Sequence, residues 1–156
     1  MIDINQLDRY VITPTLDVLD MNSLRARQLL VGTYIQEAII AKITYLHQVG
    51  GPAISLYGIE DKTYYDIYDN YLQRRKSIAR KINKLTQYLG NPDDMHGNLY
   101  HATAMARVHY WRRPEPIPDT PLEMAKYYKK FYNTIEGKAD ANEAVKHFET
   151  AFYLLK

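Results

Sequence analysis

The chain has 156 residues, of which 46% are hydrophobic and 24% charged, and this is the composition of a folded protein rather than a disordered one. Its 20 basic and 18 acidic residues leave a net charge of +2, so charge alone predicts no binding to nucleic acid or to a membrane surface. The chain contains no cysteine, which excludes disulfides, thiolate catalysis and cysteine-ligated zinc.

The apolar residues of the first 60 positions predict two helices and a short strand. Helical spacing predicts a first helix over about residues 7–19, interrupted near Pro14 because proline lacks an amide donor. A second helix begins after Asn22 or Ser23, either of which can cap it, and ends before the turn sequence "GGP". The segment "AISLYGIE", residues 53–60, is too short for a helix and predicts a small strand.

The rest of the chain predicts further helices separated by glycine and proline. These helices cover residues 61–75, 77–89, 99–113, 122–135 and 142–156. The loop "NPDDMHGN", the stiff connector "PEPIPDTP" and Gly137 lie between them. The pattern therefore predicts an all-α fold, or an α fold with a minimal β strip, and the length predicts one domain over residues 1–156.

Several kinds of segment are missing from the sequence. It has no basic leader followed by an apolar run, and no apolar stretch approaching about 18 residues. We therefore expect no signal peptide, synthesis in a cytoplasm and no membrane insertion. Glycine-rich nucleotide-binding loops are absent too, and we expect no cofactor.

A basic run and two histidines have ordinary explanations. The basic residues of "RRKSIARK", residues 74–81, alternate with isoleucines as on a solvated helix face, so we expect no nucleic-acid binding. His101 and His109 lie near one face of a predicted helix, without a carboxylate at zinc-binding spacing. We interpret them as core or groove histidines and expect no metal site.

The 15 tyrosines, against 3 phenylalanines, are an unusual number. A tyrosine ring can be buried while its hydroxyl stays wet or hydrogen-bonded, as in grooves and interfaces. The tyrosines therefore indicate either an amphipathic rim around the core or a binding surface.

Glu37 is the sharpest candidate for chemistry. Apolar residues surround it in the sequence, among them Tyr34 and Ile35. Burial there would disfavour the charged carboxylate and raise its pKa, as a general acid at neutral pH requires. The alternative is a glutamate on the polar face of its helix, paired with Lys42 or Arg27.

Three segments, in their order and spacing, carry a resemblance to a known family. They are "YVITPTLDVLDMNSLRARQLLVGTYIQEA", "GGPAISLYGIEDKTYYDIYDNYLQRR" and "NLYHATAMARVHYWRRPEPIP". From about residue 10 to residue 118 the chain resembles lysozyme-like bacteriophage proteins, distant relatives of the soluble lytic transglycosylases and goose-type lysozyme. The segment "YNTIEGK", residues 132–138, extends this resemblance. In that group a helix ends in a glutamate, and a strip of the form Gly-Leu-(aromatic or Met)-Gln follows; Glu37 and residues 55–58 match these positions.

The resemblance implies a lysozyme-like fold that cleaves the glycan strand of peptidoglycan. Glu37 would protonate the glycosidic oxygen and then act as a base towards water or the sugar's own hydroxyl. The strip would hold the sugar through Ser55, Tyr57 and Gly58, and the rings of Tyr57 and Tyr64 would stack on sugar faces. The resemblance also implies a place in the virion, in the tail or baseplate, with other phage structural proteins as partners.

Four positions depart from the family pattern. Ala38 replaces a serine, Ser55 a glycine, Gly58 a glutamine and Asp61 a proline. The missing glutamine removes a group that positions sugar and acid, so the sequence predicts weak turnover or none. Glu60 is either a second carboxylate or, as we favour, an acid at a helix N-terminus.

Two interpretations therefore remain open: a peptidoglycan-cleaving virion protein, or a purely structural particle protein with an inactive lysozyme-like fold. If the sugar-binding cleft lacks only these hydrogen-bonding side chains, we expect Gly58→Gln together with Ala38→Ser to raise activity.

We also expect one face of the second helix to pack in the core against one face of the helix near residue 105. The residues of these two faces are Leu29, Leu30, Thr33, Ala102, Met105, Ala106 and His109.

Overall fold

The computed structural model describes residues 2–40, 46–133 and 140–156, and these residues form helices with one two-stranded sheet. The predicted fold class, all-α with a minimal β strip, is confirmed. In chain order the elements, with η for π-helical or 3-10 segments, are α1 (Ile4–Leu7), η1 (Asp8–Ile12), α2 (Thr13–Leu19), α3 (Leu24–Ile35), η2 (Gln36–Ile40), β1 (Ala53–Ile54), β2 (Ile59–Glu60), α4 (Asp61–Asn70), η3 (Leu72–Arg74), α5 (Lys76–Asn83), η4 (Pro92–His96), α6 (Leu99–Trp111), α7 (Pro121–Phe131) and α8 (Ala141–Leu154). None of the described helices is both long and apolar enough to cross a membrane.

The first predicted helix is divided into α1, η1 and α2. In η1 the backbone widens into a π-helix, and the amide of Thr13 donates to the carbonyl of Asp8, five residues earlier. Pro14 follows at the start of α2, where a residue without an amide hydrogen is tolerated. The chain thus accommodates its proline through a wider turn of helix.

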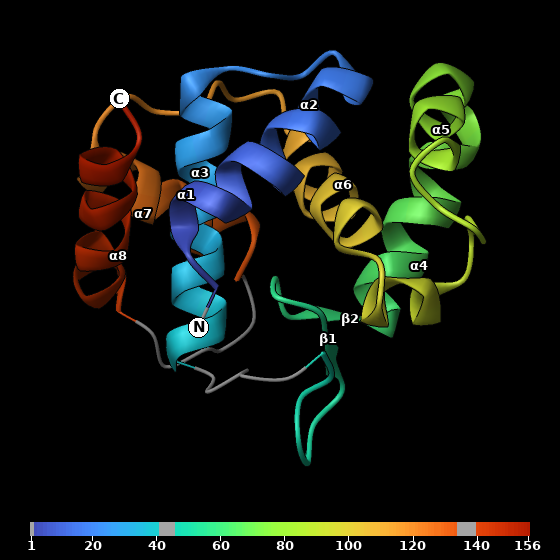
Figure 1. Ribbon diagram of the computed structural model, residues 1–156, viewed down its shortest axis with the longest axis horizontal. Helices are drawn as coiled ribbons and strands as arrows, with labels where there is room; N and C mark the ends of the chain where they lie inside the picture. The colour runs from blue at the N-terminus through green and yellow to red at the C-terminus, as the bar shows by residue number, and fades with distance from the viewer. Residues whose placement is uncertain (1, 41–45, 134–139) are drawn as a thin grey trace.

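Helix α3 lies at the centre of the fold. Every residue from Gln28 to Ile35 is buried, as expected of a helix with neighbours on several sides. It contacts α6, α7 and α8, and in Figure 1 α8 lies on one side of it and α6 on the other. Helices α3 and α6 are in contact, and the residues of both predicted faces are buried: Leu29, Leu30, Thr33, Ala102, Met105, Ala106 and His109. Leu30 shares a core cluster with Ala102, Met105 and Ala106, whereas Leu29 does not.

The hydrophobic core consists of two clusters. Leu30 belongs to the larger cluster, which α2, α4 and α6 also line, whereas Leu29 belongs to a smaller cluster with α7 and α8. Ile117 and Tyr132 pack against both clusters. Neighbouring residues of α3 therefore join the two halves of the core.

The sheet is a short hairpin that leads directly into α4. Its strands are antiparallel, with Ala53 opposite Glu60 and Ile54 opposite Ile59. The sequence predicts one small strand over residues 53–60, and both strands of the sheet lie within these bounds. Asp61 then begins α4 without an intervening loop.

Several predicted boundaries are wrong. Helix α5 ends at Asn83 instead of continuing to residue 89, because the side chain of Asn98 donates to the carbonyl of Leu85 at 2.8 Å and replaces a helical partner. The predicted loop 91–98 contains the 3-10 helix η4. Helix α7 ends at Phe131, and Gly137 lies outside the described residues.

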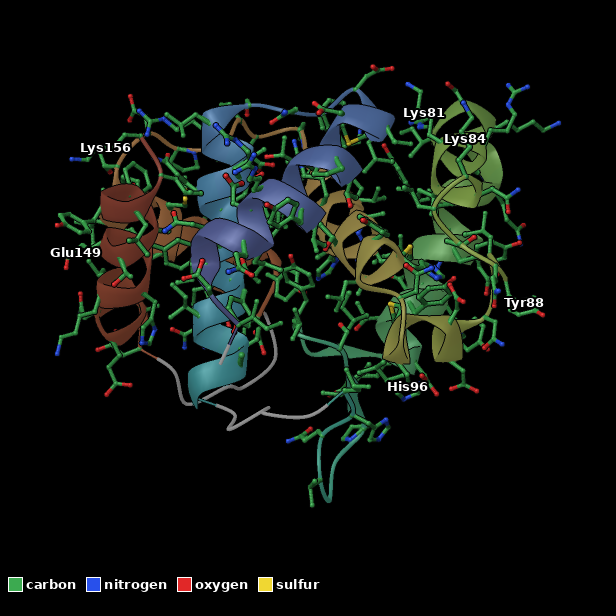
Figure 2. All side chains as sticks on the ribbon, in the orientation of Figure 1. Lys81, Lys84, Tyr88, His96, Glu149 and Lys156 are labelled. Atoms are coloured by element: carbon green, nitrogen blue, oxygen red, sulfur yellow. The ribbon has the colours of Figure 1, made fainter. Side chains whose placement is uncertain are left out.

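The basic run forms part of α5, which buries Ile82 in the core and leaves most of its basic side chains exposed. Figure 2 shows Lys81, on α5, and Lys84, directly after it, at one end of the molecule, and Lys156 and Glu149 at the other. The ammonium of Lys81 lies 2.8 Å from the carboxylate of Asp20, which follows α2. This ion pair connects α5 to α2.

Candidate functional site

Helix α8 holds the end of α3 in place and thereby positions Glu37. A Cβ on Gly32 would overlap the ring of Phe148, so the absence of a side chain lets that ring lie against α3. One turn later, the side-chain oxygen Oε1 of Gln36 lies 2.6 Å from Nδ1 of His147. Glu37 is the next residue, in the first turn of η2.

The carboxyl group of Glu37 lies between α7 and the strip (residues 55–58). The hydroxyl of Tyr128 donates to Oε1 at 2.6 Å. On the other side, a Cβ on Gly58 would lie only 2.7 Å from Oε2, so the strip's backbone is against the carboxyl. Glu37 remains partly exposed. The structure thus brings Glu37 and Gly58 together, 21 positions apart in the chain.

Burial raises the pKa of Glu37 to about 7, and hydrogen bonds from Tyr128 and Asn133 oppose that rise. The apolar surroundings dominate because they penalise the charged form. Near neutral pH the protonated and ionised forms therefore coexist. A group in this condition can both donate and accept a proton, which acid–base catalysis demands.

The strip is a tight turn with two left-handed residues. Ser55 has φ +70° and Gly58 has φ +61°. The amide of Gly58 donates to the carbonyl of Ser55 at 3.2 Å, and the Ser55 hydroxyl accepts from the amide of Tyr57 at 3.3 Å. Ser55 is buried, so it stabilises the turn and its hydroxyl is engaged within the protein. The strip therefore presents backbone to Glu37.

A second tyrosine, Tyr132, which directly follows α7, is hydrogen-bonded to the strip. The hydroxyl of Tyr132 donates to the carbonyl of Tyr57 at 2.7 Å. Its ring stacks on that of Tyr128, with 5.8 Å between ring centroids. The segment that binds Glu37 through Tyr128 therefore also binds the strip through Tyr132.

The predicted stacking of tyrosine rings on sugars is corrected by their burial. Tyr57 and Tyr64 are both fully buried and have no exposed ring face. The hydroxyl of Tyr57 accepts from Thr103 at 3.2 Å, and that of Tyr64 lies 2.9 Å from Nε2 of His101. Both rings belong to the core because their hydroxyls find partners there.

Glu60 lies at the junction of β2 and α4. It is the N-cap residue of α4, without a side-chain capping bond, and its carboxylate lies 2.9 Å from the ammonium of Lys62. This position fits the favoured interpretation of a helix N-terminal acid.

Of the predicted alternative partners of Glu37, Arg27 pairs with Asp8 at 2.9 Å instead, and Lys42 lies outside the described residues.

Both histidines of α6 are buried and have partners. Nδ1 of His101 lies 2.7 Å from a carboxylate oxygen of Asp94. His109 lies 3.0 Å from the guanidinium of Arg112, and burial together with that cation lowers its pKa to about 4. Within residues 2–40, 46–133 and 140–156, no group of three or more histidine, aspartate or glutamate side chains is arranged to hold a metal ion.

Three residues of this site, Tyr128, Tyr132 and Asn133, were not predicted from the sequence. Tyr128 and Tyr132 are four residues apart, the spacing of one helix face, and the chain is rich in tyrosine. This signal indicated a shared face but not what it contacts, since Tyr128 is 91 positions from Glu37.

Comparison with known proteins adds no family to these observations. No protein-family model matches the chain, and no curated protein or solved structure is significantly similar to it. The site is therefore interpreted from its own geometry and from the residues that carry the lysozyme-like resemblance.

Proposed function

We propose that the chain is a lysozyme-like protein of a bacteriophage particle and that Glu37 is its acid for cleaving the glycan strand of peptidoglycan. The observation that carries this proposal is the carboxyl group of Glu37, which has a pKa of about 7 and lies against a backbone turn. The resemblance described above supplies the substrate and the virion location.

The chemistry requires one carboxyl group that changes role. Protonated Glu37 donates its proton to the glycosidic oxygen, and the bond between the sugars breaks. The resulting carboxylate then takes a proton from water or from the sugar's own hydroxyl, while the oxygen of that group bonds to the anomeric carbon left by the cleavage; this completes the reaction and regenerates the acid. Tyr128, already hydrogen-bonded to Oε1, stabilises the carboxylate between these steps.

A second candidate function is a structural particle protein without turnover, and a specific observation favours it. Tyr128 occupies Oε1, and the backbone of Gly58 lies against Oε2. Both tyrosine rings that would have bound sugar are buried. A carboxyl group enclosed in this way has little room for a glycosidic oxygen.

The two candidates differ in a turbidity assay on purified peptidoglycan. For the enzyme we expect clearing by the wild type, at least about 100-fold slower clearing by Glu37→Gln, and unchanged clearing by Glu60→Gln. Glu60→Gln is the matched control because it makes the same change beside the strip. Equal clearing by the wild type and Glu37→Gln would refute the assigned acid.

Absence of clearing by all three proteins would instead favour the structural candidate. The virion location has its own test, which is density for this chain at a defined place in particles imaged by electron microscopy. Particles that lack the chain would refute that location under either candidate.

A further inference from the structure

The guanidinium group of Arg107, on α6, is a buried cation without an anionic partner. Only 5% of Arg107 is exposed, and its Nε has no hydrogen-bond partner. None of the ion pairs among the described residues includes it. The ring of Trp111, whose centroid lies 5.0 Å from Cζ, favours the cation but is not an anion. Charged groups are rarely buried without compensation, so this arginine indicates a missing anion.

Arg107 lines a cavity of about 460 Å³ that also contains two other arginines. Arg25 contributes from the first turn of α3, and Arg113 from the segment after α6. Neither arginine has a carboxylate partner: Arg25 donates to the amide oxygen of Gln28, and Arg113 lies over the ring of Phe131. Three arginine residues therefore contribute to the lining of one cavity.

Other features of the cavity also suit an anion. Ser23, the N-cap residue of α3, lines it, and the N-terminus of this 12-residue helix carries partial positive charge. The one carboxylate in the lining belongs to Glu115, which lies 3.9 Å from the ammonium of Lys130 and is partly neutralised there. The hydroxyl of Tyr127 donates to the carbonyl of Glu115 at 3.1 Å and fixes this wall.

We propose that this cavity binds a phosphate group, either as the free ion or as the phosphate of a small phosphorylated ligand. Three arginines against one glutamate in the lining favour a dianion over a singly charged carboxylate, and planar guanidinium donors match the geometry of phosphate oxygens. The cavity volume suits a small ligand. The cavity lining includes neither Glu37 nor any residue of the strip, so the proposal is independent of glycan cleavage.

The chain carries a reporter for this site, because its single tryptophan, Trp111, lines the cavity. At constant ionic strength, we expect inorganic phosphate to change Trp111 fluorescence in a saturable way, and sodium acetate to bind at least about tenfold more weakly. Phenyl phosphate distinguishes the source: tighter binding than inorganic phosphate indicates a phosphorylated ligand, and equal or weaker binding indicates the free ion. No saturable response to either phosphate probe, or equal affinity for acetate, would overturn the proposal.

Arg107→Met tests the residue itself. We expect at least about tenfold weaker phosphate binding, with Arg75→Met as the matched control that leaves binding unchanged. Arg75 also lies over an aromatic ring, that of Tyr71, but does not line the cavity. Phosphate should raise the Tm of the wild type and of Arg75→Met, and leave that of Arg107→Met unchanged.

A purely structural role for Arg107 predicts a different result, in which Arg107→Met loses stability in phosphate-free buffer and phosphate changes the Tm of no variant. That result would overturn the proposal. If Arg107→Met does not fold, the exposed Arg113→Gln replaces it, and we expect this variant to bind phosphate several-fold more weakly. Unchanged phosphate affinity in Arg113→Gln would likewise count against the site.

Discussion

At the scale of single residues, Glu37 couples chemistry to stability. Its pKa is about 7 in the folded protein against 4.5 in the absence of burial. Between these pH values the unfolded chain is ionised while the folded protein keeps its proton, so the unfolded state is favoured as pH rises. The stability that the protonated form contributes is complete below pH 4.5 and is lost as pH rises through 7.

Glu37→Gln removes this titrating group, so the free energy of unfolding should depend less on pH in this variant than in the wild type. We expect the free energy of unfolding of the wild type, relative to Glu37→Gln, to fall by about 3 kcal/mol from below pH 4.5 to above pH 7. Urea unfolding at a series of pH values measures both proteins. Parallel stability curves would show that Glu37 is not held in a setting that favours its neutral form.

Gly58 is a second residue whose identity follows from its contacts. Its φ of +61° disfavours any side chain, and a Cβ would lie 2.7 Å from Oε2 of Glu37. A glutamine at this position would therefore be strained and would meet the carboxyl group of Glu37. We no longer expect Gly58→Gln to raise activity, because the new side chain would displace the carboxyl group that it was meant to assist.

Gly58→Ala measures this contact against a control of the same backbone conformation. Gly50 has φ +75° and open space where its Cβ would lie, so Gly50→Ala reports the conformational penalty alone, about 1–2 kcal/mol. We expect Gly58→Ala to cost about 1–3 kcal/mol more, through the clash with Glu37. Chemical denaturation of both variants provides the comparison, and equal losses would mean that the strip does not press on the carboxyl group.

At the scale of elements, the contact between α3 and α8 sets the position of the site. A Cβ on Gly32 would overlap the ring of Phe148, so Gly32→Ala should force the two helices apart. We expect a loss of about 2–3 kcal/mol in unfolding free energy, in line with overpacked cores. Adding Phe148→Leu, which removes the ring, should restore part of the loss in a double-mutant cycle. Strictly additive effects would contradict this packing.

The elements also show how far sequence reasoning reaches. Local signals located helix starts to within a residue or so: Ser23, one of the two predicted caps, caps α3 with its side chain, and α6 and α7 begin at Leu99 and Pro121 against predicted starts at 99 and 122. The end of α5 was not predicted because the carbonyl of Leu85 accepts a hydrogen bond from the side chain of Asn98, 13 positions further along the chain, instead of from a helical amide. No local pattern contains such a contact.

Some features of the candidate site could likewise be predicted from the sequence, and others could not. Apolar neighbours predicted the raised pKa of Glu37, and the segment order placed the strip beside it. Tyr128 was not predicted as its partner, because helical spacing assigns a residue to a face without saying which distant element that face meets. The burial of Tyr57 and Tyr64 depended likewise on partners in and around α6, namely Thr103 and His101.

At the scale of the whole molecule, the two hydrophobic clusters should unfold together. They meet along α3 and share Ile117 and Tyr132, so neither can lose its packing without exposing the other. Tyr128 and Tyr132 add hydrogen bonds from the α7 region to Glu37 and to the strip. These links are the physical basis for expecting one cooperative domain over residues 1–156.

Phe148→Ala tests this cooperativity from one end of the molecule. The ring is fully buried in the smaller cluster, so its loss should cost about 3–5 kcal/mol. Far-ultraviolet circular dichroism follows all helices, whereas Trp111 fluorescence follows the end of α6. In one cooperative unit both signals must shift to the same lower denaturant midpoint, and Tyr153→Ala, at a 74% exposed position of the same helix, must leave both unchanged. If α8 instead melts on its own, part of the circular dichroism signal will be lost before Trp111 responds, because the larger cluster will have kept its packing without the smaller one.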